Sequence, residues 1–371
     1  MNVVLRSAIG RLRFGHDQRE LALLYVACLV GALVVSMVLI EINGSSWSRA
    51  VNALVDGAFQ NPGRWGETLR RTAPLLIVAV GSVVATQAGI INIGQEGQLL
   101  IGAMGGAFVL TLVQPGNPLL LLVGIALGAA SGAAWAGVAG VLWYWRRIPI
   151  VLSTLLLVYL ASQMAAYTLT RGELLLNVVP GEPNRLLQSA AVAPGSRLGI
   201  IEMFGNRFPL SVPIALAMAL MFGWLLSRTT WGFRLRVLGL NPRTAKRAGV
   251  SDVRYGMSAI LVSGATAGMA GAMMLAGGES QYKFSSGFSS SVGWDGLLVA
   301  LVARNSPLLA VPVAVVFAAL RSGSTFLSVA GIEAVLVDVV RALLVVALFI
   351  PPAISDLRRK RRAIASLTER T

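Results

Sequence analysis

Charged side chains are scarce in this chain. They make up 13% of its 371 residues, whereas 56% of the residues are hydrophobic and the mean hydropathy is +0.73. Soluble domains carry about 25% charged residues. A chain of this length therefore has too little polar sequence to cover a water-soluble surface, and its composition predicts an integral membrane protein.

Cysteine and histidine are almost absent. Cys28 lies inside the first apolar run, and His16 lies in the basic N-terminal segment. One cysteine forms no intrachain disulfide, and one residue of each type is too few for a His/Cys metal site. No small-residue cleavage site follows the first apolar run, so we interpret that run as a retained helix and not as a signal peptide.

The charge that is present has mostly one sign. Lysine and arginine number 31 against 16 acidic residues, which gives a net charge of +15. Such an excess could bind nucleic-acid phosphates. Here, however, the basic residues lie between apolar segments, as they do where Lys and Arg are kept in cytoplasmic loops. We therefore expect membrane lipid, and no nucleic acid, around this chain.

Apolar segments follow one another along the chain, separated by turns rich in Gly, Pro and Asn. They cover residues 21–40, 73–91, 97–113, 119–143, 150–170, 209–227, 257–277, 293–303, 307–321 and 333–350. The sequence therefore predicts an all-α integral membrane protein with about ten transmembrane helices.

The distribution of basic residues orients these segments, because loops rich in Lys and Arg stay in the cytoplasm. The expected inside regions are the basic N-terminus 1–20, the basic loop 228–256 and the basic tail 351–371; the expected outside regions are 43–71, as an interfacial or re-entrant helix plus a loop, and 171–208. The transmembrane domain then covers 21–350.

A six-residue pattern occurs twice. Residues 94–99 read Gly-Gln-Glu-Gly-Gln-Leu, and residues 293–298 read Gly-Trp-Asp-Gly-Leu-Leu. Each hexamer places a carboxylate between two glycines at the start of an apolar run, where a charge is costly. Paired, glycine-interrupted hydrophobic segments are the best sequence indication of a transporter's central pathway.

The positions of the hexamers divide the chain into repeats. One span precedes a group of four, at 73–170, and another single span precedes a second group of four, at 257–350. The two groups start in opposite directions, and each carries its hexamer between its first and second helices. This arrangement predicts an inverted four-helix repeat.

Polar side chains at membrane depth are the candidates for lining the pathway. They are Gln87, Asn92, Gln95, Glu96, Gln98, Ser153, Thr154, Gln163, Trp294 and Asp295. Each has a structural alternative. Asn92, Glu96 and Asp295 could cap the helices that follow them. The tryptophan could belong to an interfacial aromatic belt, and the hydroxyls could bond to their own helix backbone.

Asp338 and Arg341 lie three residues apart in the last span, on one helical face. That spacing allows them to pair. A buried pair of this kind either holds helices together or takes part in ion coupling.

The basic loop contains its own helix signals. Asn241 is a good helix cap, Pro242 suits the first helical position, and Gly249 can end the helix. The sequence therefore predicts a helix of two turns outside the membrane. Its alternative role is attraction to lipid headgroups. The sequence contains no P-loop, nucleophile elbow or zinc signature, so we expect no catalytic residue and no cofactor in this chain.

Two stretches resemble one known family. Residues 89–98 resemble the Asn-Ile-Gly-x-Glu-Gly motif of ABC importer permeases of the branched-chain amino acid, ribose and nucleoside type. Residues 239–250 resemble the coupling segment of the same family, with Arg247 where the family often has an aromatic residue. The resemblance covers residues 73–350. Within the family, the sequence Gln-Glu-Gly-Gln at 95–98 and the long loop at 171–208 are most similar to those of nucleoside permeases.

This resemblance implies a type II ABC importer-like fold in the bacterial inner membrane. It implies a separate ABC ATPase subunit that holds ATP and magnesium, a second permease subunit forming a heterodimer, and a lipid-anchored or periplasmic substrate-binding protein. The residues it implies for ATPase coupling are Gly239, Asn241, Pro242, Ala245, Arg247, Ala248 and Gly249.

A nucleoside is neutral and rich in hydrogen-bonding groups, which suits a path of amides and hydroxyls. The same machine could instead carry a simple sugar, riboflavin or a branched-chain amino acid. An ion-coupled secondary transporter using Glu96, Asp295 or Asp338 is a different class, and it leaves the capped basic helix without a purpose. An intramembrane enzyme would need a nucleophile and base, which the spans do not offer.

Overall fold

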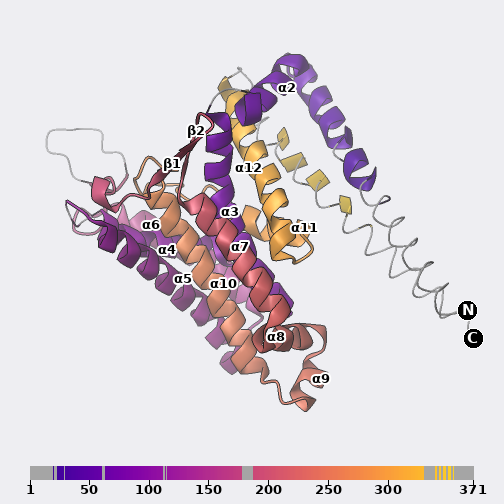
Figure 1. Ribbon diagram of the computed structural model, residues 1–371, viewed down its shortest axis with the longest axis vertical. Coiled ribbons are helices and arrows are strands. Elements are labelled where there is room, and N and C mark those ends of the chain that lie inside the picture. Colours follow the sequence, from indigo (N-terminus) through magenta and orange to yellow (C-terminus); the bar gives the residue numbers. More distant parts are fainter. Residues whose placement is uncertain are drawn as a thin grey trace, which may run out of the picture. The chain divides into compact units, whose positions relative to one another are not determined.

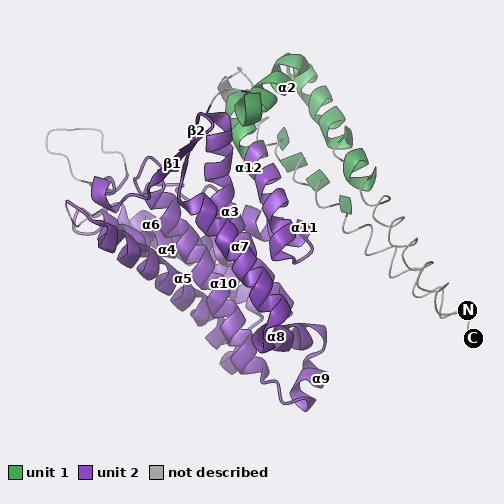
Figure 2. Cartoon of the chain, viewed as in Figure 1, with its two compact units in different colours: residues 1–61, 320–371 green, residues 62–319 purple. Residues whose placement is uncertain are grey.

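The computed structural model describes residues 23–28, 30–60, 63–111, 115–177 and 187–329, with residues 20 and 113 and scattered positions between 339 and 354. The chain forms two compact units (Figure 2). Unit 1 contains residues 1–61 and 320–371, and unit 2 contains residues 62–319. The predicted pair of Asp338 and Arg341 lies outside the described residues.

Unit 2 is built mainly from helices (Figure 1). Its elements are α3 (Arg64–Gln87), α4 (Gln95–Leu110), α5 (Pro118–Arg146), α6 (Ile150–Thr168), η2 (Pro194–Ser196), β1 (Ile200–Met203), β2 (Asn206–Pro209), α7 (Ser211–Arg228), α8 (Thr230–Leu240), α9 (Pro242–Arg247), α10 (Asp252–Ala276) and α11 (Val292–Val302). Outside unit 2 lie a helix at Leu23–Ile42, then α2 (Trp47–Val55) and η1 (Asp56–Gln60), and α12 (Pro307–Val329) crosses the boundary between the units.

Seven of the described helices are long and apolar enough to cross a membrane. They are Leu23–Ile42, α3, α5, α6, α7, α10 and Pro307–Leu327 within α12. The helix α11 has only 11 residues. At about 1.5 Å per residue it spans roughly half of a hydrocarbon core about 30 Å thick. The second hexamer thus begins a half-length helix.

The core of unit 2 surrounds α3 and α10. Of the apolar 18-residue stretch of each helix, 83% is buried in α3 and 78% in α10, whereas only 22% is buried in α5 and 28% in α6. Helix α10 packs against α5, α4 and α3, and α3 also packs against α11 and α7. Glycine allows α10 and α5 to approach closely. A Cβ on Gly268 of α10 would lie 2.2 Å from the carbonyl oxygen of Gly128 of α5, which is too close for any side chain.

Two regions differ clearly from the sequence prediction. Helix α3 begins at Arg64 and not at residue 73, because Glu67 pairs with Arg70 and with Arg71 (2.8 Å) along the helix. These charges extend the helix beyond its apolar run. The predicted polar loop at 171–208 contains an antiparallel hairpin of β1 and β2, which turns through left-handed residues at Phe204 and Gly205.

Candidate functional site

The two hexamers contact each other within unit 2. Glu96 lies in the first turn of α4, but its carboxylate reaches the start of α11. One oxygen, Oε2, accepts a hydrogen bond from the backbone N–H of Gly293 (2.7 Å), and the other, Oε1, accepts one from Ser291 (3.2 Å). Glu96 is only 6% exposed. The first four N–H groups of a helix need such acceptors, and a carboxylate suits that end of the helix dipole.

The expectation that Glu96 caps the helix following it is therefore wrong in one respect. Glu96 caps a helix, but the helix is α11 and not its own α4, where the N–H of Gly94 is bonded by Asn92. The physical reason is proximity. A Cβ on Gly293 would lie 2.4 Å from both the Cα and the N of Glu96, so α11 starts directly against the backbone of α4.

The amides beside Glu96 form a buried network. Asn92 and Gln98 exchange side-chain bonds, with Nδ2–Oε1 at 2.9 Å and Nε2–Oδ1 at 3.1 Å. Asn92 and Gln95 each donate to the hydroxyl of Ser263 on α10 at 3.0 Å. The hydroxyl of Ser82 on α3 donates to Oε1 of Gln95 at 2.6 Å. The network joins α4 to both central helices.

Every member of this network is almost fully buried, with an exposed fraction of 1% or less. These hydrogen bonds all join groups of the chain to one another, and a satisfied buried network specifies one arrangement of the helices. Asn92 also accepts from the N–H of Gly94 (3.0 Å), just before α4 begins. In this structure these amides hold helices together, and their contact with a solute stays a prediction.

Five further candidates lie on α6 and α11. Ser153 and Thr154 are buried, and their hydroxyls donate to carbonyls of their own helix, as the structural alternative expected. Gln163 is exposed on α6, and Trp294 is half-buried at the start of α11. Asp295 is buried in the first turn of α11.

Gln87 takes part in a contact that the sequence does not reveal. Its Nε2 donates to the backbone oxygen of Asn305 (3.1 Å), and the hydroxyl of Thr86 donates to Oδ1 of Asn305 (2.9 Å). Asn305 lies in the turn between α11 and α12. Ser82 and Ser263 are not predictable from the sequence either, because a hydroxyl in an apolar span usually bonds to its own helix and gives no signal of a longer contact.

The basic loop contains the predicted helix. Asn241 Oδ1 accepts from the N–H of Arg243 (3.0 Å) and of Thr244 (3.1 Å), and Pro242 is the first residue of α9. Gly249 has φ +76°, the left-handed conformation that ends many helices. Within α9, only Ala245 is buried. The other side chains of this helix are exposed, as they would be on a docking surface.

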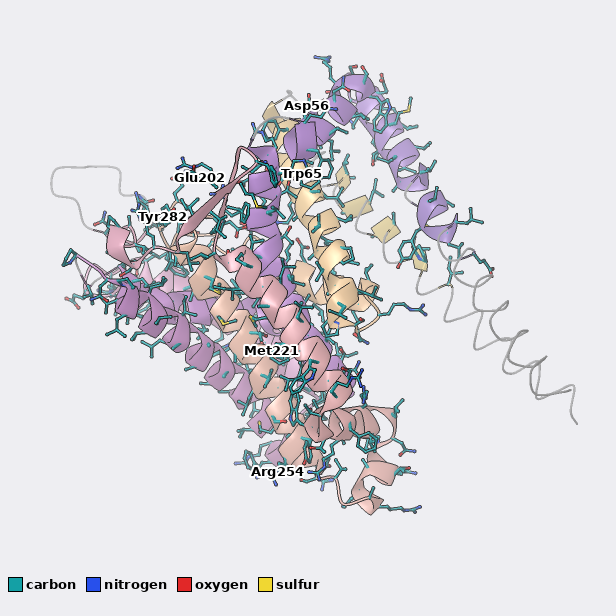
Figure 3. All side chains as sticks on the ribbon, in the orientation of Figure 1. Asp56, Trp65, Glu202, Met221, Arg254 and Tyr282 are labelled. Carbon is teal, nitrogen blue, oxygen red and sulfur yellow. The ribbon has the colours of Figure 1, made fainter. Side chains whose placement is uncertain are left out.

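The two ends of unit 2 differ in charge. Figure 3 shows Arg254 at the end that carries α8 and α9, and Glu202 and Tyr282 at the opposite end. Basic residues crowd the first end, and they are Arg234, Arg236, Arg243, Lys246, Arg247 and Arg254. At the other end, charges of both signs pair, as Glu202 does with Arg207 (2.5 Å). Positive loops mark the cytoplasmic side.

Known proteins match the chain over most of its length. A family model described as the branched-chain amino acid transport system permease component matches residues 66–349. The guanosine ABC transporter permease protein NupP of Bacillus subtilis is 28% identical over 323 residues, which are 86% of this chain and 90% of that protein.

Two further relatives are similar. The glucose ABC transporter permease protein TsgB13 of Haloferax volcanii is 30% identical over 75% of this chain and 74% of its own length. The nucleoside ABC transporter permease protein NupB of Lactococcus lactis is 26% identical over 81% of this chain and 82% of its own. No solved structure matches this chain significantly.

Proposed function

Because this chain belongs to the family of branched-chain amino acid transport system permease components, we propose that it is the pathway-forming subunit of an ABC importer for nucleosides. It is a multi-pass membrane protein and a permease, and the proposal concerns its cargo, its direction of transport and its partners. ATP would be hydrolysed by a separate subunit, since the sequence carries no P-loop.

The observation that carries this proposal is the helix α9. It is short, capped by Asn241, exposed on most of its surface, and carries Arg243, Lys246 and Arg247 at the basic end of unit 2. A transporter driven by ions needs no such projection. A permease driven by an ATPase needs a rigid element that the ATPase can grip, and a capped helix with exposed side chains meets that need.

An inverted repeat also accounts for the order of the helices. A long buried helix, a hexamer and a shorter helix occur in sequence at α3 and α4, and the same order returns at α10 and α11. We propose that residues 73–170 and 257–350 are the two repeats and that the full count of spans is ten. The contact between Glu96 and α11 then joins the two repeats at their glycine breaks, the points where residues 94–99 and 293–298 interrupt the apolar segments.

The proposed partners follow from this architecture. The ATPase would bind the exposed side chains of α9 from the cytoplasm. A second permease subunit would complete the pathway, and an external binding protein would deliver the solute to the side that holds 171–208. That binding protein would supply most of the affinity, because the described amides of the core are already bonded to the chain itself.

The length of the alignments favours a nucleoside over glucose as the cargo. The guanosine relative aligns with more of this chain, and with more of its own length, than the glucose relative does. Both cargoes are neutral and form many hydrogen bonds, so the charge distribution of the permease does not separate them. A sugar remains the second candidate, because the glucose relative has the higher identity.

The ATPase partnership can be tested at Asn241. Asn241→Ala removes the acceptor of two N–H groups, and loss of such a cap costs about 1 kcal/mol. We expect co-purification of the ATPase and ATP-dependent uptake both to fall. Asn241→Ser is the matched control, because serine caps almost as well as asparagine. Equal ATPase binding by the two variants, or uptake that stops when an ion gradient is collapsed, would contradict the proposal.

The cargo is tested by competition. Uptake of radiolabelled guanosine by cells carrying the complete importer should be reduced by unlabelled nucleosides and unaffected by glucose or ribose. Competition by a sugar alone would replace the nucleoside with the sugar and leave the permease assignment in place.

A further inference from the structure

Helix α8 lies against the end of α3 with no space between them. A Cβ on Gly239, in the last turn of α8, would lie 2.3 Å from the carbonyl oxygen of Gln87 and 2.8 Å from the N of Gly89. Both are backbone atoms, so they cannot move aside as the tip of a flexible side chain can. Gly89 itself has φ +76°, which favours glycine at that turn.

The first half of α8 is attached to α10. The indole N–H of Trp231 donates to the hydroxyl of Ser258 at 3.2 Å. The guanidinium of Arg234 donates to the hydroxyl of Tyr255 and lies 5.5 Å from the centre of its ring. Helix α8 therefore contacts both central helices of unit 2, with α10 at one end and α3 at the other.

Helix α8 is also joined directly to α9. Asn241 ends α8 and caps α9, so no flexible linker separates the two helices. Ala245 is the buried residue of α9, while its exposed residues remain available to a partner. A force applied to α9 therefore reaches α8 through one shared residue.

Beyond these contacts lies the buried network around the first six-residue pattern, which we call the hexamer core. Its members are Ser82, Asn92, Gln95, Gln98 and Ser263. Ser263, further along α10 than Ser258, accepts from Asn92 and Gln95. At the end of α3, Gln87 donates to Asn305 in the turn that follows α11. The two helices contacted by α8 thus lead to different groups: α10 leads to the amides around the first hexamer, and α3 leads to the turn that follows α11.

We propose that Gly239 is a positioning residue, and that its contact with the Gln87–Gly89 turn passes movement of α9 to the hexamer core. The inference rests on the proposed function, in which an ATPase grips α9. Glycine is required because any side chain at 239 pushes α8 away from the turn and leaves α9 attached to the ATPase but not to α3. The residue is therefore needed for coupling and not for docking.

The test uses the complete importer with its ATPase, second permease and binding protein. Gly239→Ala should leave co-purification of the ATPase and its ATP hydrolysis intact, and should lower solute taken up per ATP hydrolysed about tenfold, within the range usual for coupled sites. The matched control is Gly223→Ala in α7, whose added Cβ would meet only Leu308 side-chain atoms at 3.5 and 3.6 Å. Its uptake per ATP should equal that of the unchanged protein.

Several results would overturn the inference. Uptake per ATP within about twofold of normal for Gly239→Ala would show that the contact transmits nothing. Loss of the ATPase would show that Gly239 belongs to the docking surface. Should Gly239→Ala fail to accumulate, Tyr255→Phe, which removes only the hydroxyl that Arg234 reaches, takes its place. Normal uptake per ATP in that variant overturns the inference.

Failure of the proposed function would look different. In that case the unchanged protein would neither co-purify with an ATPase nor show ATP-dependent uptake. Normal coupling in the unchanged protein together with normal coupling in both variants removes the transmission role alone.

Discussion

The two hexamers have the same pattern but different surroundings. In the first, residues 94–99, the variable positions are Gln95 and Gln98, which bond to side chains around them. In the second, residues 293–298, the same positions are Trp294 and Leu297. The first hexamer therefore supplies polar contacts to α3 and α10, and the second supplies the helix end that the first one caps.

This difference shows how two copies of one sequence pattern can take different structural roles. A carboxylate in an apolar segment is costly unless it has partners. Glu96 finds its partners in the other hexamer, at Ser291 and Gly293. The two glycine breaks are thus held as one structure. Any movement that separates α4 from the start of α11 has to break these bonds.

The largest effect on stability is expected from removing the Glu96 carboxylate, because it joins the two hexamers. Glu96→Ala leaves the buried N–H of Gly293 and the part-buried N–H of Ser291 without this acceptor, at a cost of about 2–4 kcal/mol in the free energy of unfolding. The expected readout is reduced stability in detergent, measured by thermal or steric-trapping unfolding, together with loss of uptake.

Glu96→Gln is the control for that change, because glutamine has a side chain of the same length and keeps one oxygen that can accept a hydrogen bond. It should retain most of the stability that Glu96→Ala loses. If the alanine variant unfolds like the unchanged protein, the capping of α11 by Glu96 has no energetic importance.

The sequence predicted what depends on local pattern. Apolar runs located α5, α6, α7 and α10 to within a few residues, and the cap and stop signals located α9. It missed α8, the β-hairpin and the early start of α3. Helix α8 has neither a continuous apolar run nor an amphipathic pattern strong enough to distinguish it from a basic loop.

The site was predicted in part. The hexamers were identified, but the partner of Glu96 was not, because Glu96 and Ser291 lie 195 positions apart and only tertiary packing brings them together. Ser263 gave no signal for the same reason. The number of spans and the inverted repeat stay predictions, since the last span falls largely outside the described residues.

Comparing equivalent glycines sharpens the contrast between the hexamers. A Cβ on Gly293 would lie 2.4 Å from backbone atoms of Glu96, whereas the nearest atom to a Cβ on Gly94 is Thr154 Cβ at 3.0 Å. Gly293→Ala should therefore lower the free energy of unfolding by about 1–3 kcal/mol, the usual cost of overpacking. Gly94→Ala should cost less.

The same unfolding measurement in detergent decides between these glycine variants. Equal losses would mean that the two breaks are packed alike, and a larger loss at Gly94 would reverse the comparison. Uptake should follow the same order, because displacement of α11 also lengthens the bonds to Glu96.

The smallest effect is expected where the first hexamer reaches α10. Ser263→Ala removes the hydroxyl that accepts from Asn92 and Gln95, and leaves their other bonds in place. A hydrogen bond between membrane helices contributes about 0.6 kcal/mol on average, so we expect a loss of about 1 kcal/mol for the two.

Ser227→Ala supplies the matched control. The hydroxyl of Ser227 is at the exposed end of α7 and donates to a carbonyl of its own helix, Gly223, at 2.7 Å. Its removal should change the free energy of unfolding by less than about 0.5 kcal/mol. If the two serine variants lose the same stability, the amides of the first hexamer hold α4 without help from α10, and the polar contacts that distinguish it from the second hexamer end at α3.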